Sequence, residues 1–368
     1  MKWRLIISGP LDPLSIHTIY EAIAYNVSER KTPNTLHICW PAKPYICVGI
    51  HQAVDLEVDI DECRRQGLEI VRRQVGGGTV YLDQNQFFYH IIAHKKDAPR
   101  GLKELFSLFL KPTVCTYRKF GVNAEYRPLN DVVVDGKKIS GNGAASFGNA
   151  VVVVGNVILD IDPKKFASIL RVPTEKVRDK LIKSIDQWVS SLKKEIGYAP
   201  TMDNVAKTYI ECFSELFGAE LIEDKLTKDE IGLMEKLKNK YGSDEWLYKY
   251  RRRHKKLLDY ASGGRRKVKI MEGHYIIYIV DKPEKLFRII TEIKDGMIID
   301  ILISGDFFMN PPDIIDSLEQ TLIGTRIGEL RDLSANNIAR QIGIDPKKQK
   351  DTTRIIEQIL LTLSKIEL

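Results

Sequence analysis

Apolar residues recur along the first two thirds of the chain with two different periods. Short apolar or alternating runs, which are typical of β-strands, occupy residues 1–8, 36–40, 45–50, 68–73, 79–82, 86–93, 131–135 and 150–160. Helix-like stretches, several of them with an apolar face, occupy residues 59–66, 102–121, 163–170, 174–182 and 204–216. This alternation of strands and helices predicts a mixed α/β (α+β) fold.

A polar, charge-rich stretch from Glu223 to Glu245 interrupts this pattern. Beyond it, strand-like runs at 267–270, 275–280, 286–293 and 297–303 precede helices, which indicates a smaller α+β unit. The chain has 368 residues, more than a single domain usually holds. We therefore predict a first domain over residues 1–225, a linker over 226–245 and a second domain over 246–368.

The composition is that of a globular protein, because 43% of the residues are hydrophobic and 29% are charged. The apolar runs, such as Val151–Val154 and Tyr275–Val280, are much shorter than the roughly 20 residues that a membrane helix needs. The first residues lack the long apolar stretch and cleavage site of a secretory signal. We expect a cytoplasmic protein that does not span a membrane.

Cysteine spacing and net charge limit which covalent links, metal sites and partners the sequence supports. The five cysteines, Cys39, Cys47, Cys63, Cys115 and Cys212, form no CxxC pair, so we predict reduced, mostly buried thiols and neither a disulfide framework nor a zinc site. The net charge of +7 comes partly from basic runs at 251–256 and 265–267. A solvated basic face and a surface for an acidic partner explain these runs about equally well. The sequence shows no helix-turn-helix or zinc-finger pattern, so we expect no nucleic-acid partner.

Three consecutive glycines, Gly76–Gly78, stand between two strand-like segments. Glycine permits positive φ and has no Cβ, so backbone N–H groups there can closely approach a phosphate or a carboxylate. Arg72 and Arg73 precede the glycines, and strand alternation directs their guanidinium groups to opposite faces. We expect one arginine to meet an anion and the other to be structural. Because hairpins and bulges also use glycine, this motif alone leaves both interpretations open.

A second motif, Gly-Lys-Lys-Ile-Ser-Gly-Asn-Gly, follows at residues 136–143. It places Lys137 and Lys138 on a turn between strands, and the small residues after them let a ligand lie against the backbone. One lysine at such a turn can neutralise a carboxylate and an α-phosphate together.

Together the two motifs resemble the lipoate-protein ligase family, whose RRxxGGGxVxHD pattern and GxKxSG lysine turn are closely reproduced over residues 72–83 and 136–141. The run at 47–52, the pair Asn130-Asp131 and the strand at 155–160 are similar to further segments of that family. The resemblance implies a biotin/lipoyl-ligase-like fold, in which helices flank a mixed sheet, with a smaller accessory domain at the C-terminus. It also implies that ATP activates lipoate as lipoyl-adenylate before the lipoyl group passes to a carrier lysine.

By the same resemblance the first domain is catalytic, ATP and lipoate are its substrates, and Mg²⁺ accompanies ATP. Its partners would be lipoyl carrier domains of a 2-oxoacid dehydrogenase acyltransferase subunit, a glycine-cleavage carrier or a related protein. Lys138 matches the essential lysine of the family, and Lys137 is its solvated neighbour. The residues implied to bind ATP or lipoyl-adenylate are Arg72, Arg73, Gly76, Gly77, Gly78, Thr79, Val80, Tyr81, Asn130, Asp131 and Lys138. Those implied to bind lipoate are Trp40, Lys138, Gly141 and Gly155, and no metal bound by protein side chains is implied.

Four positions depart from the family pattern. Leu82 stands where a histidine commonly precedes Asp83, and Asn156 stands where a threonine usually follows the glycine. Val153 and Val154 replace the family's usual histidines. These departures predict a more apolar acyl pocket.

Two other groups of residues invite a functional interpretation. The segment Gly305–Pro312 is similar to the family's accessory domain, and we interpret its Asp306 as a turn-capping acid. His90 and His94 lie on a strand-like run without the helical spacing of an HExxH metal site, so we interpret both as structural.

Two alternative functions stay open on the sequence alone. An octanoyl or lipoyl transferase of the same fold would form a thioester on a positioned cysteine and would need no ATP. None of the cysteines lies between residues 116 and 211, the span around the lysine turn, although Cys115 could approach it through folding. A non-catalytic binding protein resembling the biotin ligases would keep the ligand pocket without the reaction.

Overall fold

The computed structural model of the protein describes residues 2–172, 174–262 and 266–367, so Arg265 of the basic run at 265–267 lies outside the described residues. The chain divides into two compact units. The N-terminal unit consists of residues 1–47, 61–71 and 80–242, and the C-terminal unit of residues 48–60, 72–79 and 243–368. Two short segments from the first quarter of the chain therefore belong to the C-terminal unit.

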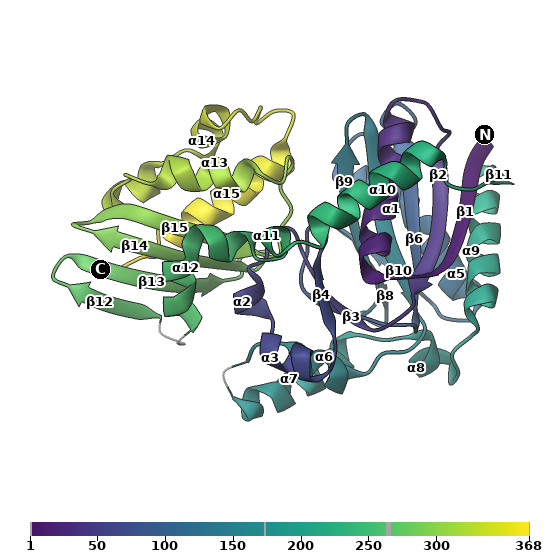
Figure 1. The fold of residues 1–368 in the computed structure, drawn as a ribbon, viewed down its shortest axis with the longest axis horizontal. Coiled ribbons are helices and arrows are strands. Elements are labelled where there is room, and N and C mark those ends of the chain that lie inside the picture. The colour runs from purple at the N-terminus through teal and green to yellow at the C-terminus, as the bar shows by residue number, and fades with distance from the viewer. Residues whose placement is uncertain (1, 173, 263–265, 368) are drawn as a thin grey trace. The chain divides into compact units, whose positions relative to one another are not determined.

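A large mixed sheet forms the centre of the N-terminal unit (Figure 1). In spatial order its strands are β11 (Glu220–Glu223), β1 (Lys2–Leu11), β2 (Thr35–Pro41), β6 (Gln86–His94), β10 (Ala150–Ile158), β9 (Lys137–Phe147), β8 (Asp131–Val134) and β7 (Glu125–Arg127). Strand β1 pairs in parallel with β2 and β11, whereas the strands from β2 to β7 pair antiparallel. This mixed sheet confirms the predicted α/β class.

Helices cover both faces of the large sheet. α1 (Pro13–Ser28) and α10 (Lys228–Tyr241) lie side by side over one face, and α5 (Lys111–Lys119) and α9 (Met202–Phe217) pack together over the other (Figure 1). The other helices before residue 243 are α2 (Val54–Glu57), α3 (Ile60–Arg65), α4 (Leu102–Phe109), α6 (Pro163–Ile169), α7 (Glu175–Trp188) and α8 (Leu192–Ile196).

Helix α1 was not predicted from the apolar pattern. Almost all of its residues are buried, between the sheet on one side and α10 on the other, so no polar face marks the helical period. The local signals at its start are nevertheless present. The Asp12 side chain accepts a hydrogen bond from the N–H of Ser15, and Pro13 occupies the first turn.

The core on the α5 and α9 side of the sheet is aromatic and carries a disulfide. Trp3 packs edge-on against Phe213, with ring centroids 5.1 Å apart. Cys115 of α5 is bonded to Cys212 of α9. The prediction of five reduced thiols is wrong for this pair, because packing of the two helices joins residues that lie 97 apart in the sequence. Cys39, Cys47 and Cys63 are buried and carry no disulfide, as predicted.

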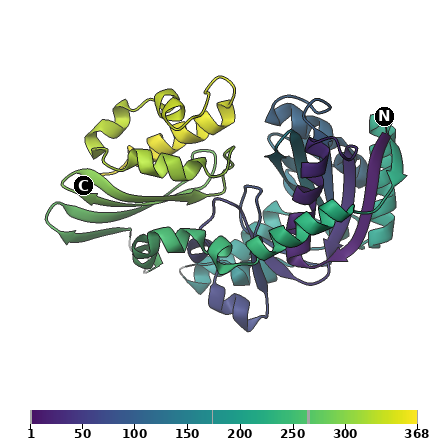
Figure 2. The same cartoon turned by 45° about the horizontal axis from the view of Figure 1, so that its top comes forward.

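The C-terminal unit is built on an antiparallel sheet with helices on both faces (Figure 2). Its strands are β12 (Lys267–Met271), β13 (His274–Asp281), β14 (Phe287–Lys294) and β15 (Met297–Gly305). One face packs against α13 (Ile314–Leu322), the 3₁₀ helix η1 (Ile327–Asp332), α14 (Ala335–Gln341) and α15 (Lys350–Leu363). The other packs against α12 (Lys249–Ser262), which follows α11 (Asp244–Leu247). Neighbouring isoleucines on one strand, such as Ile289 and Ile290, point to opposite faces and serve both layers.

Residues 226–245, which we expected to form a linker, contain α10 of the N-terminal unit. Thr227 and Glu230 form a capping box at the start of this helix. Glu230 is buried, and its carboxylate binds the Arg4 guanidinium at 2.7 Å. The segment resembles a linker in composition, but some of its charged residues, such as Glu230, are buried and form ion pairs within the fold.

A small sheet contains the strands that precede and follow the glycine motif in the sequence. Its strands, in spatial order, are β4 (Glu69–Arg72), β3 (Tyr45–Val48) and β5 (Val80–Leu82). Among the described residues, no helix has the length and apolar character needed to cross a bilayer.

Candidate active site

The lysine motif forms a tight hairpin between β8 and β9. Asp135 and Gly136 both have positive φ, at 46° and 76°, which is the backbone of a two-residue type I′ turn. A register shift after Val132 brings Lys138 opposite Val133. The carbonyl of Lys138 also accepts a hydrogen bond from the N–H of Ser190, at 2.8 Å. Lys138 is therefore held by its backbone on both sides.

Lys138 and Asp131 form an ion pair across this hairpin. The Lys138 Nζ lies 2.6 Å from Asp131 Oδ1, and Arg127 binds the other carboxylate oxygen at 3.0 Å. Burial raises the pKa of Asp131, but Lys138 and Arg127 outweigh burial and hold that pKa below its usual value. The Lys138 side chain is 37% exposed, so its ammonium can reach a ligand. Lys137, its neighbour, is exposed.

Asn130 and Asn142 bind each other's backbone beside this pair. The Asn142 side chain donates to the carbonyl of Asn130 at 3.0 Å, and the Asn130 side chain donates to the carbonyl of Asn142 at 2.5 Å. The buried Tyr89 hydroxyl donates to the Asn142 side-chain oxygen. A Cβ on Gly155 would lie 2.1 Å from that oxygen and 2.2 Å from the tyrosine hydroxyl. Glycine is therefore required at position 155 for Tyr89 to reach Asn142.

Asn156 ties three strands together next to Gly155. Its Oδ1 accepts the N–H of Gly141 at 2.8 Å, and its Nδ2 donates to Gln86 Oε1 at 2.9 Å. Its own carbonyl accepts the Ser140 hydroxyl at 2.6 Å. A threonine, which lacks a second polar atom of this reach, could not make both side-chain bonds. The departure at Asn156 thus adds a link between β6, β9 and β10.

The other departures lie in apolar surroundings. Leu82 is buried among Tyr45, Phe88 and neighbouring apolar side chains, and Val153 is fully buried in the core of the large sheet. Val154 pairs with His90 on β6. Trp40 lies near the end of β2, partly buried against the same core as Val153.

Gly76–Gly78 form an irregular loop in the C-terminal unit, here called the glycine loop. Gly77 has a φ of +98°, and a Cβ on Gly49 would lie 2.0 Å from the Gly77 carbonyl oxygen. A Cβ on Gly76 would lie 2.7 Å from the carbonyl oxygen of Phe307. Within the described parts of the chain, the N–H groups of Gly76, Gly77 and Gly78 donate to no acceptor. Successive backbone N–H donors without an acceptor are a kind of arrangement that can bind an anion.

The two arginines before the glycine loop have different surroundings. The Arg73 guanidinium donates to the carbonyls of Gly76 at 3.0 Å and Gly78 at 2.8 Å, so the loop curls around it. Arg72 is 1% exposed. It donates to the carbonyls of Gly49, Ile50, Gln52, Trp246 and Leu247. Arg72 therefore has the structural surroundings that we expected for one of the two arginines.

The residues that follow the loop divide between the units. The Thr79 hydroxyl donates to the Gln52 side chain at 3.1 Å within the C-terminal unit. Val80 and Tyr81 belong to β5 of the N-terminal unit and pair with Cys47 and Ile46. Burial, followed by two nearby aspartates, raises the pKa of Tyr81 to about 12.

The structure thus brings the predicted residues together in two groups. The N-terminal unit holds Lys138 with Asn130, Asp131, Gly141 and Gly155, and the C-terminal unit holds Arg72, Arg73, the glycine loop and Thr79. Sequence reasoning missed the positioning residues Tyr89, Gln86 and Asn142. Asn142 could have been noticed, because it lies inside the lysine motif at residues 136–143. Tyr89 and Gln86 carried no signal, since their role depends on the pairing of β6 with β10.

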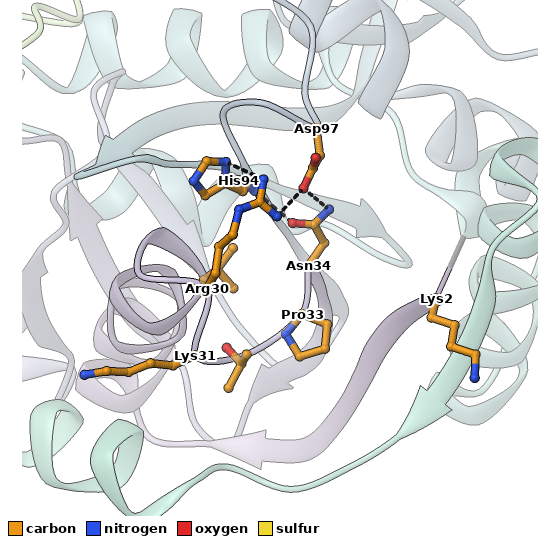
Figure 3. Close-up of a pocket in the computed structure, with 9 residues that line it drawn as sticks. Lys2, Arg30, Lys31, Pro33, Asn34, His94 and Asp97 are labelled. Carbon is orange, nitrogen blue, oxygen red and sulfur yellow. Dashed lines mark hydrogen bonds and ion pairs between the residues drawn. The ribbon is translucent and has the colours of Figure 1, made fainter.

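A pocket of about 550 Å³ opens at the opposite end of β6 from Gln86 (Figure 3). In it Arg30 contacts both His94, at 3.2 Å, and Asp97, at 3.4 Å, and Asn34 binds the same aspartate. The residues lining it are Lys2, Val27, Arg30, Lys31, Thr32, Pro33, Asn34, His94 and Asp97. His94, interpreted as structural, therefore also borders a surface pocket.

Comparison with known proteins gives the class of this chain. The family model of the lipoyl protein ligase A/B catalytic domain matches residues 12–214, more than half of the chain. The match spans the glycine loop and the lysine hairpin. The protein is therefore an enzyme of the lipoate ligase and octanoyltransferase class. It belongs to the lipoyl protein ligase A/B family, as the motifs predicted.

Individual relatives carry two different activities in their names. An octanoyltransferase LipM from Kyrpidia tusciae is 27% identical over 270 residues, which are 67% of this chain and 98% of that protein. A lipoate-protein ligase 1 from Staphylococcus aureus is 30% identical over 285 residues, 77% of this chain and 78% of that protein. A solved structure of a bipartite lipoate protein ligase from Thermoplasma acidophilum, described with its E2 lipoyl domain, has a TM-score of 0.61 and 26% identity. It covers 67% of this chain and 96% of the other.

Proposed function

We propose that this protein is an ATP-dependent lipoate-protein ligase, which forms lipoyl-adenylate and transfers the lipoyl group to a lysine of a lipoyl carrier domain. The state of the cysteines carries the proposal, because a transferase of this fold needs a reactive thiol. All five cysteines lie within the described residues. Cys115 and Cys212 are bonded to each other, and Cys39, Cys47 and Cys63 are at most 1% exposed.

Cys39 needs separate treatment because histidines lie beside it. The Cys39 sulfur and the ring nitrogens of His37 and His90 lie within 4.8 Å of one another. The Nδ1 atoms of the two histidines are 2.8 Å apart and share a hydrogen bond. Burial raises the pKa of the Cys39 thiol and lowers the pKa of His37 to about 3. A neutral histidine and a protonated, inaccessible thiol do not make an acyl-accepting nucleophile.

The polar groups of the two units suit an adenylation instead. In the first step a lipoate carboxylate oxygen attacks the α-phosphorus of MgATP, the new P–O bond forms, and pyrophosphate leaves. Lys138 reduces the repulsion between the two anions, and Asp131 holds its ammonium in place. The glycine loop supplies N–H donors that meet no acceptor among the described residues and that can bind phosphate oxygens. In the second step the amine of a carrier lysine attacks the acyl carbon, and AMP leaves.

Isotope exchange distinguishes the ligase from its rivals. The wild-type protein should exchange labelled pyrophosphate into ATP only when lipoate is present. A transferase would show no exchange but would move an octanoyl group from a thioester donor to a lipoyl domain without ATP. A non-catalytic binding protein would do neither. Transfer from the thioester donor without exchange would overturn the proposal.

The partner and the compartment follow from the proposed reaction. The Thermoplasma acidophilum relative was described together with an E2 lipoyl domain, which supports a lipoyl carrier domain as acceptor here. Lipoate, ATP and carrier would meet in the cytoplasm. Mg²⁺ would enter with the ATP phosphates as part of the substrate.

The second domain is proposed to support activation more than transfer. Arg72, just before the glycine loop, donates to the carbonyls of Trp246 and Leu247, which deletion of the second domain would remove. Residues 1–240, expressed alone and shown to be folded, should therefore lose lipoate activation. Transfer from supplied lipoyl-adenylate should persist more strongly. Full activation by this fragment would contradict the assignment.

A further inference from the structure

Two histidines and a cysteine lie together under α1 in the core of the N-terminal unit. His37 and Cys39 are alternate residues of β2, so their side chains point to the same face of the sheet. His90 stands directly opposite His37 on the antiparallel strand β6. Helix α1 covers this face, because Tyr20 contacts the His90 ring at 5.1 Å and Ile16 packs with Cys39. The three side chains are 0%, 0% and 3% exposed, so strand pairing gathers two imidazoles and a thiol away from water.

The distances between these groups are close to those of a metal site. The Cys39 sulfur and one ring nitrogen from each histidine lie within 4.8 Å of one another. The Nδ1 atoms of His37 and His90 are 2.8 Å apart, and the two rings stack with centroids 5.0 Å apart. Around a tetrahedral zinc ion, two ring nitrogens lie roughly 3.3 Å apart and a thiolate lies roughly 3.6 Å from each of them. Small side-chain rotations would therefore bring all three atoms to bonding distance.

Ser8 of β1 occupies the position of an outer partner for His37. Its hydroxyl lies 2.9 Å from His37 Nε2. When the ring carries its proton on Nε2, it donates to this hydroxyl, and the lone pair on Nδ1 is left for the side of the ring that meets His90. Histidines that bind metals are oriented by such a hydrogen bond at the second nitrogen. His37 is thus held as a metal-binding histidine is held.

Packing alone does not satisfy the polar atoms of this group. Within the described residues, the His90 ring has one hydrogen bond, the one that it shares with His37, and the Cys39 sulfur has none. Burial of an imidazole without its full set of hydrogen bonds costs free energy, which a pair of apolar side chains on adjacent strands would avoid. A bound cation would use the nitrogen lone pairs and the sulfur together.

The chemistry of the three donors selects the ion. A thiolate with two imidazoles suits zinc, whereas Mg²⁺ and Ca²⁺ prefer oxygen ligands. Zinc takes four ligands, so one position remains after the three side chains. His17 of α1 faces the same region, but its Nε2 is hydrogen-bonded to the Tyr45 hydroxyl at 3.0 Å. We therefore assign the fourth position to a water molecule.

We propose that His37, Cys39 and His90 bind one zinc ion in the core of the N-terminal unit. On binding, the Cys39 thiol gives its proton to the solvent and forms a Zn–S bond. The hydrogen bond between the two rings is replaced by two Zn–N bonds, and each ring keeps its proton on Nε2, so one proton is released for each zinc bound. Because the ligands are buried, the ion enters as the unit folds.

Such a site would cross-link β2 to β6 next to Trp40, which follows Cys39 in the sequence. It involves neither Lys138 nor the glycine loop and does not rest on the proposed ligase function. The spacing of the cysteines gave no sign of it, because a CxxC pattern reveals only ligands that are close in the sequence, whereas these come from two paired strands.

The metal content of the purified full chain tests the site. Wild type expressed with added Zn²⁺ should carry about one zinc per chain after gel filtration in metal-free buffer. Cys39→Ala and His90→Phe each remove one ligand and should keep roughly a tenth of that content or less. Cys63→Ala is the matched control, since Cys63 is another buried cysteine of the same unit without a disulfide, and it should bind as the wild type does. A zinc-free wild type, or equal zinc content in Cys39→Ala and wild type, would overturn the proposal.

Cobalt provides a readout that a purely structural pair of histidines would not give. Wild type expressed with Co²⁺ in place of Zn²⁺ should show thiolate-to-cobalt charge-transfer absorption and the intense visible bands of a tetrahedral ion. Cys39→Ala should lose the charge-transfer absorption. Weak octahedral bands without charge transfer in the wild type would mean that the ion is bound elsewhere, and the assignment would be wrong.

Thermal unfolding guards against a folding defect in the variants. A chelator should lower the melting temperature of zinc-loaded wild type, because an ion that binds only the folded state stabilises it. It should leave the melting temperatures of Cys39→Ala and His90→Phe unchanged. Melting of zinc-loaded wild type that does not respond to removal of the ion would count against a site in the core. The cobalt spectrum and the chelator effect in the wild type decide the question even when a variant does not fold.

Discussion

The ammonium of Lys138 lies 2.6 Å from the carboxylate of Asp131, on the neighbouring strand of the same hairpin. Arg127 binds the second oxygen of this carboxylate, so the pair is fixed before any ligand arrives. A preorganised cation pays little reorganisation energy when anionic charge develops next to it. Asp131 thus places Lys138 without neutralising the whole cluster, which keeps Arg127 as a further cation.

Replacement of Lys138 by alanine should lower the rate of lipoyl-adenylate formation by roughly a hundredfold to a thousandfold. The reason is that Asp131 pairs with Lys138 through one oxygen and with Arg127 through the other, so the variant loses the cation on the Lys138 side of this carboxylate. Lys137→Ala is the matched control, because Lys137 is exposed and next in sequence. It should keep most of the activity. The measurement is lipoate-dependent pyrophosphate exchange, and equal losses in both variants would show that the lysine is assigned incorrectly.

Valine at position 77 should block nucleotide binding while leaving most of the fold intact. Gly77 has a positive φ that β-branched residues avoid, and its loop is packed closely against Gly49. Gly232→Val is the control, since a side chain at this position of α10 would meet nothing within 4 Å. Equilibrium binding of ATP, checked against circular dichroism, measures the effect. Normal affinity in a folded Gly77→Val protein would contradict the anion-binding role of the loop.

Removal of the disulfide should lower stability without ending catalysis. Cys115 and Cys212 close a loop of 97 residues, and a cross-link of this span contributes about 3–5 kcal/mol to the free energy of unfolding. The double variant Cys115→Ser/Cys212→Ser should therefore melt at a lower temperature and still form lipoyl-adenylate. Thiol titration of denatured wild type should find three free thiols before reduction and five after it. Loss of acyl transfer in a folded double variant would instead indicate cysteine chemistry.

Glu21 should make stability depend on pH. Burial raises the pKa of this carboxyl to about 7, although Tyr241 donates a hydrogen bond to it. The folded state then binds more protons than the unfolded state between about pH 4.5 and pH 7, so the contribution of Glu21 to stability falls as the pH rises through this window. Glu21→Gln should remove that slope, and the exposed control Glu29→Gln should keep it. Urea unfolding at several pH values measures both, and identical slopes in all three proteins would refute the prediction.

The sequence predicted the elements that carry a clear period and the motifs that carry chemistry. The strands around the glycine loop and the lysine hairpin were found, because alternation and punctuating glycines are local signals. Helix α1 was missed because its burial on nearly all sides leaves no polar face. The disulfide between Cys115 and Cys212 was missed because it depends on the packing of α5 against α9.

The three-dimensional surroundings of individual residues could not be predicted from the motifs. Adjacent arginines look equivalent in the sequence, yet Arg72 is bound to distant carbonyls while Arg73 is surrounded by the glycine loop. Likewise, nothing near Tyr89 in the sequence indicates that it reaches Asn142, since the contact passes over Gly155 on a different strand. The order of residues along the chain also gives no sign that residues 48–60 and 72–79 belong to the C-terminal unit.

The bond between Arg72 and the carbonyl of Trp246 joins residues that are 174 positions apart. A ribosome adding about 5–20 residues per second needs on the order of 10–35 s to cover that distance. During this interval Arg72 has the carbonyls of Gly49, Ile50 and Gln52 as acceptors but lacks those of Trp246 and Leu247. The full set of bonds that holds the Arg72 side chain can therefore form only after residues 246 and 247 have been synthesised.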